Sequence, residues 1–259
     1  MKMRKVFYIL FIGILFSGCS PDEAATCFKG AGEIVQDEVE VETFDEIIVY
    51  ERVKLFIQQG PEQIVIVETG ENLKDEITVE VENSRLSIKN GNSCNLFREY
   101  EVTKVYVTVP DLTWLQNSSG STIESIGVLK FANLWLRSFN QEDDSTIRTV
   151  GDFKLNLDVE NLRITNDQYS NYFLSGKVEN LNIFFAAGDG RLEAGDLVVQ
   201  HSEIFHRGTN KMILNPQQSV TGEIRSSGDV ICIIKPPVVD VEEFYTGKLV
   251  FPPTPEGGF

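Results

Sequence analysis

Four short tetrads recur in the second half of the chain and constrain its fold more than any other feature. They read NLWL at 133–136, NLRI at 161–164, NLNI at 180–183 and DLVV at 196–199, at spacings of 28, 19 and 16 residues. In an extended strand, the leucine and the aliphatic residue two places later share one face. One such strand cannot bury its aliphatic face alone, so the repeat predicts coils of a β-solenoid that stack around a common apolar core.

The polar residue ahead of each leucine is the second regular feature of the tetrads. Asn133, Asn161, Asn180 and Asp196 occupy this position, and short polar side chains of this kind form ladders along turns. An antiparallel β-sandwich is the alternative architecture, because it also has short strands at regular spacing. The repetition of one tetrad favours the solenoid.

Residues 42–110 read as successive strands in which apolar and polar residues tend to alternate. Val105, Val107 and Val109 fall on one face of an extended strand, as do the apolar residues of ITVEVE at 77–82. The turn-forming stretches QQGPE, TGEN and NGNS separate these segments. No segment of comparable length has helical apolar spacing, so the chain is predicted to be all-β.

The extreme N-terminus has the features of a secretion signal. Basic residues precede an apolar run of 11 residues, 6–16, which is shorter than the roughly 20 residues that cross a bilayer as a helix. FSGC at 16–19 resembles the lipobox of bacterial lipoproteins, which implies cleavage and lipidation at Cys19. The following SPDE resembles the acidic signal that sends Bacteroidetes lipoproteins to the outer face of the outer membrane. An ordinary secretory signal is the alternative.

The balance of charge excludes one class of partner. The chain has 39 acidic and 23 basic residues, a formal charge of −16, and removal of residues 1–18 makes it about −19. Phosphate backbones and anionic lipid surfaces are held by basic patches, and none is visible in the sequence. We therefore expect no nucleic-acid partner, and membrane attachment through the lipid anchor alone.

The remaining three cysteines lie in two kinds of sequence surroundings. Cys27 and Cys94 lie in loop-like segments and are the expected disulfide pair in an oxidising compartment. Cys232 lies within the apolar run VICII and is expected to be a small buried side chain.

Two groups of polar residues invite a chemical interpretation. Glu142, Asp143 and Asp144 suggest calcium binding or acid–base catalysis, but three consecutive acids point in different directions and fit a solvated loop better. His201 and His206 fall on opposite faces of a strand and cannot readily chelate one metal ion. We therefore expect no metal, no cofactor and no catalytic residue.

Exposed aromatic residues are the better candidates for ligand contact. Trp135 points away from the face of Leu134 and Leu136, and Tyr169 and Tyr172 lie in an excursion between coils. Exposed tryptophan and tyrosine suit a sugar ring or a protein partner, and packing of the excursion onto the coil is the alternative. The tripeptide DST also predicts O-glycosylation at Ser145.

Several longer stretches carry a family resemblance. FDEIIVYERVKLFIQQG at 44–60, VTVPDLTWLQNSSGSTI at 107–123, the NLxI tetrads, GEIRSSGDVICIIKPP at 222–237 and FYTGKLVF at 244–251 resemble the head GIN domain family of auto-transporter adhesins. The resemblance implies a right-handed parallel β-helix and an adhesion-like or structural role outside the cytoplasm, and it supplies no catalytic residue.

The expected organisation follows from these segments. It comprises a signal peptide at 1–18, a lipid-anchored acidic leader at 19–41, an N-terminal β region at 42–110, a β-helix at 111–251 and a disordered tail at 252–259. The expected function is that of a surface-exposed outer-membrane lipoprotein that binds a glycan or an envelope protein. A secreted polysaccharide-active β-helix enzyme and a purely structural envelope component are the alternatives, and the oligomeric state stays open.

Overall fold

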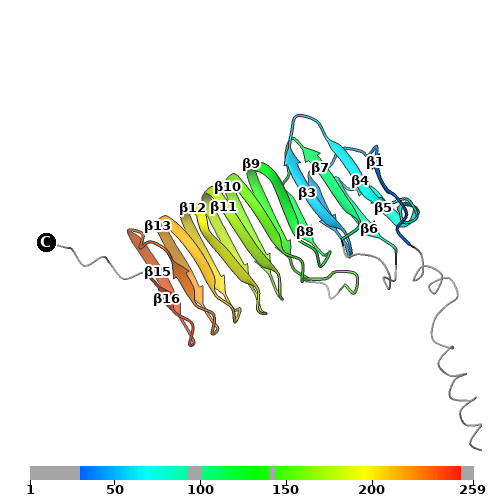
Figure 1. Ribbon diagram of the computed structural model, residues 1–259. Coiled ribbons are helices and arrows are strands. Elements are labelled where there is room, and N and C mark those ends of the chain that lie inside the picture. Colours follow the sequence, from blue (N-terminus) through cyan, green and yellow to red (C-terminus); the bar gives the residue numbers. More distant parts are fainter. Residues whose placement is uncertain (1–29, 93–100, 141–143, 252–259) are drawn as a thin grey trace, which may run out of the picture.

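The computed structural model describes residues 30–92, 101–140 and 144–251, whose strands join into one 16-stranded, mostly parallel sheet (Figure 1). Within these ranges the helical element is a short 3-10 turn, η1 (Lys74–Glu76). No helix in the described ranges has the length and apolar character needed to cross a bilayer. The all-β prediction is therefore confirmed.

The first half of the sheet is built from short strands with alternating burial. Val105, Val107 and Val109 are buried on one face, as their alternation predicts. The strands β1–β4, β4–β7 and β5–β6 pair antiparallel, whereas β2–β6, β2–β8 and β3–β7 are parallel. The strands of this half are β1 (Ile34–Glu38), β2 (Glu46–Val49), β3 (Lys54–Gln59), β4 (Ile64–Gly70), β5 (Ile77–Glu82), β6 (Arg85–Asn90), β7 (Lys104–Val109) and β8 (Trp114–Asn117).

The second half consists of five long bent strands followed by three short ones. Each long strand pairs in parallel with the next one in the chain, so that they lie side by side in sequence order (Figure 1). This parallel pairing excludes the antiparallel sandwich for this region. The strands are β9 (Ile123–Ser138), β10 (Phe153–Asn166), β11 (Asn171–Phe185), β12 (Arg191–His206), β13 (Met212–Ile224), β14 (Val230–Cys232), β15 (Val238–Glu243) and β16 (Leu249–Val250).

The two halves are hydrogen-bonded to one another. β3 and β8 both pair in parallel with β9, and β2 pairs with β8. The described part of the acidic leader joins the same sheet, because β1 pairs with β4.

The pairing register confirms three of the four tetrads and corrects the fourth. Asn133, Asn161 and Asn180 are direct partners on neighbouring strands, and so are the leucines and aliphatic residues that follow them. DLVV does not continue this register, because Asp196 pairs with Ser175, five residues before Asn180. The segment that stacks on NLNI is HSEI at 201–204, in which Ser202 takes the place of the leucine.

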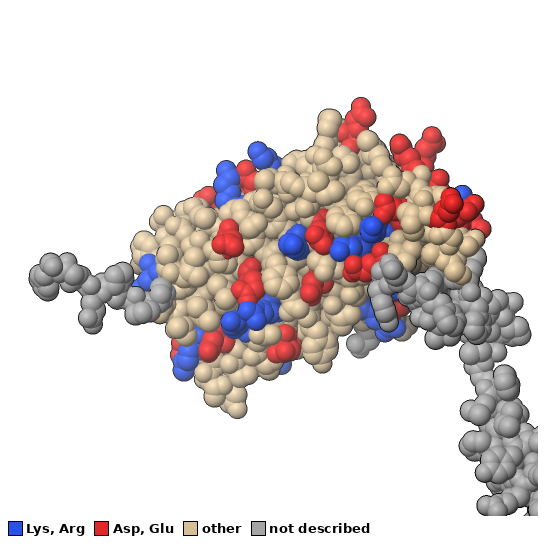
Figure 2. Space-filling view, in the orientation of Figure 1, with Lys and Arg blue, Asp and Glu red and all other residues tan. Residues whose placement is uncertain are grey.

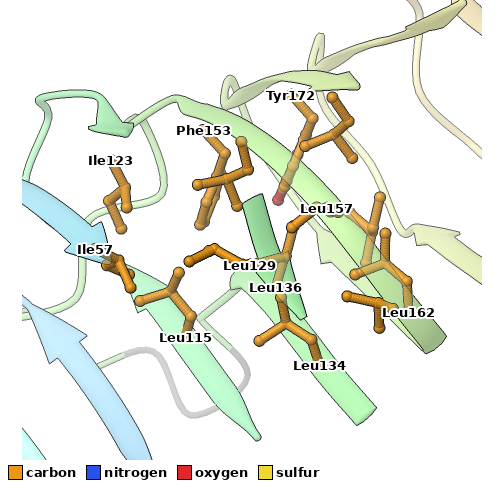
Figure 3. Packing of buried hydrophobic residues seen from close by; sticks show 14 of the residues in the cluster. Ile57, Leu115, Ile123, Leu129, Leu134, Leu136, Phe153, Leu157, Leu162 and Tyr172 are labelled. Atoms are coloured by element: carbon orange, nitrogen blue, oxygen red, sulfur yellow. The ribbon is translucent and has the colours of Figure 1, made fainter. Parts of the chain in front are cut away.

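The core is a column of side chains that runs along the strand stack. Ile123, Phe153, Tyr172, Leu192, Met212 and Val230 form one row of mutual partners, all with an exposed fraction of 0%. The leucine row joins it from the other side: Leu134, Leu162 and Leu181 are exposed by 1–2%. Figure 3 shows the labelled members of both rows pointing toward one another. The tetrad leucines thus share one apolar core, as the repeat predicts.

Candidate ligand-binding groove

Two outward-facing rows of side chains cross the five long strands. Because the strands are in register, members of a row follow one another at about 4.8 Å, the spacing of neighbouring strands. Together with Thr113 the rows line a groove of about 370 Å³. The outer row comprises Trp135, Arg163, Asn182, Glu203 and Thr221, and the amide row comprises Asn133, Asn161, Asn180, His201 and Ser219.

The amide row is a hydrogen-bonded ladder. The side-chain amide of Asn161 donates to Oδ1 of Asn133 over 3.0 Å, and that of Asn180 donates to Oδ1 of Asn161 over 2.9 Å. His201 Nδ1 and Ser219 Oγ are 2.9 Å apart. The predicted polar ladder therefore exists for three asparagines, but it lies on strands rather than along a turn. Each amide has two N–H donors and gives at most one to the ladder, so at least one donor per residue stays available to a ligand.

Trp135 is held in place by its neighbours. Its indole Nε1 donates to Thr165 Oγ1 over 2.9 Å, and the guanidinium of Arg163 lies over the ring with Cζ 4.3 Å from the centroid. Arg137 contributes a second contact at 5.4 Å. Trp135 faces outward as predicted, but Arg163 covers its ring. The group that reaches solvent at this point is thus the Arg163 guanidinium, which the sequence analysis did not single out.

A second hollow of about 640 Å³ adjoins the groove on the other side of Trp135. Trp114, exposed by 8%, forms part of its wall, and the guanidinium of Arg85 lies 4.3 Å from the Trp114 ring centroid. Arg85 is also paired with Glu46 over 2.6 Å. The same stacking of arginine on tryptophan therefore occurs twice on this face, once with a carboxylate partner and once, at Arg163, without a carboxylate partner among the described residues.

An aromatic stripe lies two residues further along β11 and β12, at Phe184 and Phe205, and Phe139 joins it from just beyond the end of β9. Phe139 meets Phe184 edge-on at 6.4 Å between centroids, and Phe184 stacks on Phe205 at 4.9 Å. Arg137 and Arg225 lie over the two ends of the stripe. Sequence reasoning missed the stripe, although Phe184 and Phe205 both directly follow the second aliphatic position of aligned segments.

The structure separates the two predicted contact tyrosines and removes one of them from the surface. Tyr169 is 60% exposed and does not line the groove. Tyr172 is fully buried: it stacks on Phe153 at 4.8 Å, and its hydroxyl donates to the Thr165 carbonyl over 3.3 Å. Burial raises the pKa of this phenol well above its usual value. The prediction of ligand contact at Tyr172 is wrong, because the register places it in the central core row.

Of the three consecutive acids Glu142, Asp143 and Asp144, the structure describes Asp144, whose carboxylate stabilises the local loop. Glu142 and Asp143 lie outside the described residues. Asp144 accepts two hydrogen bonds from Thr146, at the backbone N–H and at the hydroxyl, both over 2.8 Å, and these bonds lower the pKa of its carboxyl. Ser145 between them is exposed, and its glycosylation stays a prediction.

The remaining candidates lie apart from one another. His201 is exposed and His206 is fully buried, in keeping with their expected opposite faces. In the described ranges no three His, Cys, Asp or Glu side chains are grouped so as to hold a metal ion. Cys232 is buried, and burial raises the pKa of its thiol to about 12, as expected for an inert side chain. Cys19, Cys27 and Cys94 lie outside the described residues, as does the tail at 252–259.

Solved structures share this architecture. A "putative adhesin" from Bacteroides fragilis superposes with a TM-score of 0.74 at 16% identity, covering 86% of this chain and 99% of its own. A "putative lipid binding protein" from Parabacteroides distasonis has a TM-score of 0.59 at 17% identity, covering 85% and 97%. A "putative adhesin" from Parabacteroides merdae has a TM-score of 0.57 at 13% identity, covering 85% and 98%. At these identities the likeness shows the fold alone.

The sequence itself places the chain in a family. No curated protein matches it. Residues 43–236, which include the strands that line the groove, match the family described as "Putative auto-transporter adhesin, head GIN domain". The chain therefore belongs to the head GIN domain family of auto-transporter adhesins, as its sequence resemblance predicts.

Proposed function

We propose that the protein is a non-catalytic, adhesin-like component of the cell envelope that binds an extracellular glycan in the groove between the outer row and the amide row. The observation that carries the proposal is the lining of this groove. Amide and hydroxyl groups from five successive strands converge on it, and they match the hydroxyl groups that a saccharide presents.

The shape of the groove also favours an extended ligand. Its two rows cross β9 to β13 at about 4.8 Å per strand, so they span roughly 19 Å. A chain of several sugar rings laid across the strands meets a similar set of donors at each step. Charged and amide side chains dominate both rows, which favours a sugar over a lipid tail.

We also propose that the stack winds as a right-handed parallel β-helix. β10 has 14 residues and, if straight, extends over about 46 Å, whereas the four residues that link it to β11 span at most about 18 Å. The start of β11 nevertheless pairs with the start of β10. Each long strand therefore has to bend round to its own beginning, as in a solenoid coil, and parallel crossovers are right-handed in about 98% of cases.

The proposed location is the outer membrane, with the domain facing outward. Family membership supports a place at the cell surface or envelope, and the FSGC sequence supports a lipid anchor on Cys19. Replacing Cys19 by serine tests the anchor, because the variant is then expected to leave the membrane fraction.

The composition of the groove supports a binding role over catalysis. Hydrolysis of glycosidic bonds uses a pair of carboxyl groups that flank the bond. Glu203 is the single carboxylate among the described residues that line the groove. A polysaccharide-active enzyme is the rival proposal, and release of reducing ends from a bound polysaccharide would establish it.

The test is a glycan array and cell-surface pulldown with the chain from Ser20 onward. Asn161→Ala and Asn182→Ala each remove an amide that lines the groove, and loss of one hydrogen bond to a ligand lowers affinity by about fivefold to tenfold. Gln200→Ala, which removes an amide that lines a separate hollow, is the matched control and should leave binding unchanged.

Two outcomes contradict the proposal. Equal binding of native and groove variants to every recognised glycan places the site elsewhere on the molecule. Failure to bind any glycan, together with capture of a single envelope protein, replaces the glycan by a protein partner.

A further inference from the structure

We infer that the glycan bound in the groove carries carboxylate groups and that Arg163 is the residue that anchors one of them. This inference rests on the proposed glycan-binding function and specifies the chemical class of the sugar.

Arg163 has no acidic partner among the described residues, unlike three other exposed arginines. Arg85 pairs with Glu46, Arg148 pairs with Glu51, and Arg225 pairs with Glu223. Arg163 is exposed, forms no ion pair or hydrogen bond with any described residue, and opens into the groove. Its five N–H donors are therefore available to a ligand.

Trp135 holds this guanidinium in a defined position. The 4.3 Å distance from Cζ to the ring centroid is that of a close cation–π contact, and the hydrogen bond from Trp135 to Thr165 fixes the ring beneath it. A guanidinium oriented in this way loses little further freedom on binding. Its planar fork matches the two oxygens of a carboxylate, which it binds through two parallel hydrogen bonds.

Glu203 makes the two ends of the groove differ in charge, with the positive Arg163 toward one end and the negative Glu203 toward the other. It lies two strands beyond Arg163 in the outer row, at roughly 9.6 Å by strand spacing, and it accepts a hydrogen bond of 2.9 Å from Asn182. Its carboxylate repels an acidic group and accepts hydrogen bonds from hydroxyls. The acid of the sugar therefore belongs at the Arg163 end of the groove, with hydroxyl groups over Asn182 and Glu203.

The negative net charge of the chain does not prevent an acidic sugar from binding in the groove, because the acidic side chains are concentrated elsewhere. Residues 30–90 hold 15 acidic and 5 basic side chains, and Figure 2 shows acidic side chains gathered at the end that carries these N-terminal strands. The described residues lining the groove contribute one acidic group, Glu203, and the Arg163 guanidinium. At physiological salt the Debye length is about 8 Å, so the distant acidic end is largely screened.

The experiment measures binding to polygalacturonate, alginate and hyaluronate, each compared with its methyl ester, which keeps the sugar backbone and removes the charge. Native protein is expected to prefer the free acids, with an affinity that falls as salt rises. Arg163→Gln should weaken binding to the acids by about tenfold or more, since it removes a charge-assisted hydrogen-bonded pair. Glu203→Gln should strengthen it, because a repulsive charge is lost.

Arg207→Gln is the matched control. Arg207 is an exposed arginine outside the groove, so this variant has the same change of net charge as Arg163→Gln. It should leave affinity within about twofold. Unchanged thermal unfolding of all three variants establishes that the fold is intact.

The inference is overturned, while the proposed function stands, by equal affinity for acids and esters or by binding confined to neutral glycans. Equal weakening by Arg163→Gln and Arg207→Gln also overturns it, since the effect is then one of net charge alone. Absence of binding to every polysaccharide overturns the proposed function as well.

Discussion

His206 is a buried titratable group whose surroundings favour the neutral imidazole. Its Nε2 lies 2.9 Å from the Asn210 carbonyl, so that nitrogen carries the proton, and the buried Nδ1 has no partner among the described residues. Burial lowers the pKa of His206, and this outweighs the bond to Asn210 and the charge of Asp229, which raise it. Acid therefore forces either a buried charge or an opening of this part of the core.

The stability of the protein should accordingly fall in mild acid through His206. A folded-state pKa below the unfolded value gives stability that is present above about pH 6.5 and lost as the pH falls toward the folded pKa. The loss from one such group is at most about 1.4 kcal/mol per pH unit. Chemical denaturation between pH 8 and pH 5 measures it.

Two variants isolate the contribution of this histidine. His206→Gln keeps an N–H donor for Asn210 and should flatten the pH dependence relative to the native protein, whereas His201→Gln at the exposed site should not. A native and a His206→Gln curve of the same slope would show that other groups, chiefly carboxylates, account for the acid sensitivity.

Hydrophobicity alone does not tell which side of a strand faces inward when both sides are aromatic. In NYF at 171–173, Tyr172 is buried and Phe173 is 44% exposed, although phenylalanine is the more apolar residue. The stacking of Tyr172 on Phe153 of the preceding strand decides the matter, and that contact depends on pairing register. Without this register, the sequence pattern alone predicts Tyr172 at the surface.

At the scale of strands, the bend of a long strand depends on backbone conformations that glycine adopts. Gly176 in β11 has φ +106°, and a Cβ there would lie 2.0 Å from the Leu157 carbonyl oxygen of β10. Gly127 in β9 has φ +75°, but a Cβ there would meet nothing within 4 Å. The two positions share a positive φ, which strains any residue with a Cβ, and they differ in contact with the neighbouring strand.

This difference predicts unequal costs of one methyl group. Gly127→Ala should lower the free energy of unfolding by about 1–2 kcal/mol, the cost of a left-handed backbone for an L-residue. Gly176→Ala should lower it by about 3 kcal/mol or more, because the strands have to move apart as well. Urea denaturation of both variants measures the gap, and equal losses would indicate that β10 and β11 separate without appreciable cost.

The fourth tetrad, DLVV at 196–199, lies in a predicted strand but at a different place along it from the other three tetrads. A long bent strand presents Leu-x-aliphatic twice, once on each side of its bend: β10 has Leu157 and Val159 as well as Leu162 and Ile164, all buried. DLVV belongs to the first side, because Leu197 and Val199 pair with Gly176 and Val178, the partners of Leu157 and Val159. The sequence pattern therefore identified the strands and their inward faces, but not which side of the bend each tetrad occupies.

At the scale of the molecule, the groove was beyond reach of sequence reasoning for a related reason. Its outer row joins residues 28, 19 and 21 positions apart: the tetrads align Trp135, Arg163 and Asn182, but the step to Glu203 is visible only once the register is known. In each of the three aligned tetrads, the residue between the leucine and the aliphatic residue faces outward, and this pattern predicts the outward orientation of Trp135. Ser202 hid the next step, because a buried serine breaks the leucine pattern.

A stack of parallel strands also distributes its stability unevenly, because each strand contacts only its neighbours. β10, β11 and β12 are each paired on both sides over most of their length, and their inward residues form the middle of the core. At the C-terminal end β15 pairs with β13 alone and has mostly exposed side chains, and β16 holds only two residues.

Amide hydrogen exchange should reproduce this gradient. Backbone amides of β10–β12 open only when both neighbouring strands are lost, so their exchange should approach that of global unfolding, while amides of β15 and β16 should exchange through local opening. Low urea concentrations should accelerate exchange in the core strands and leave the rates at the end nearly unchanged, because local opening exposes little surface. Uniform protection from β9 to β16 would mean instead that the stack unfolds as a single cooperative unit and that its exposed end is held by contacts other than strand pairing.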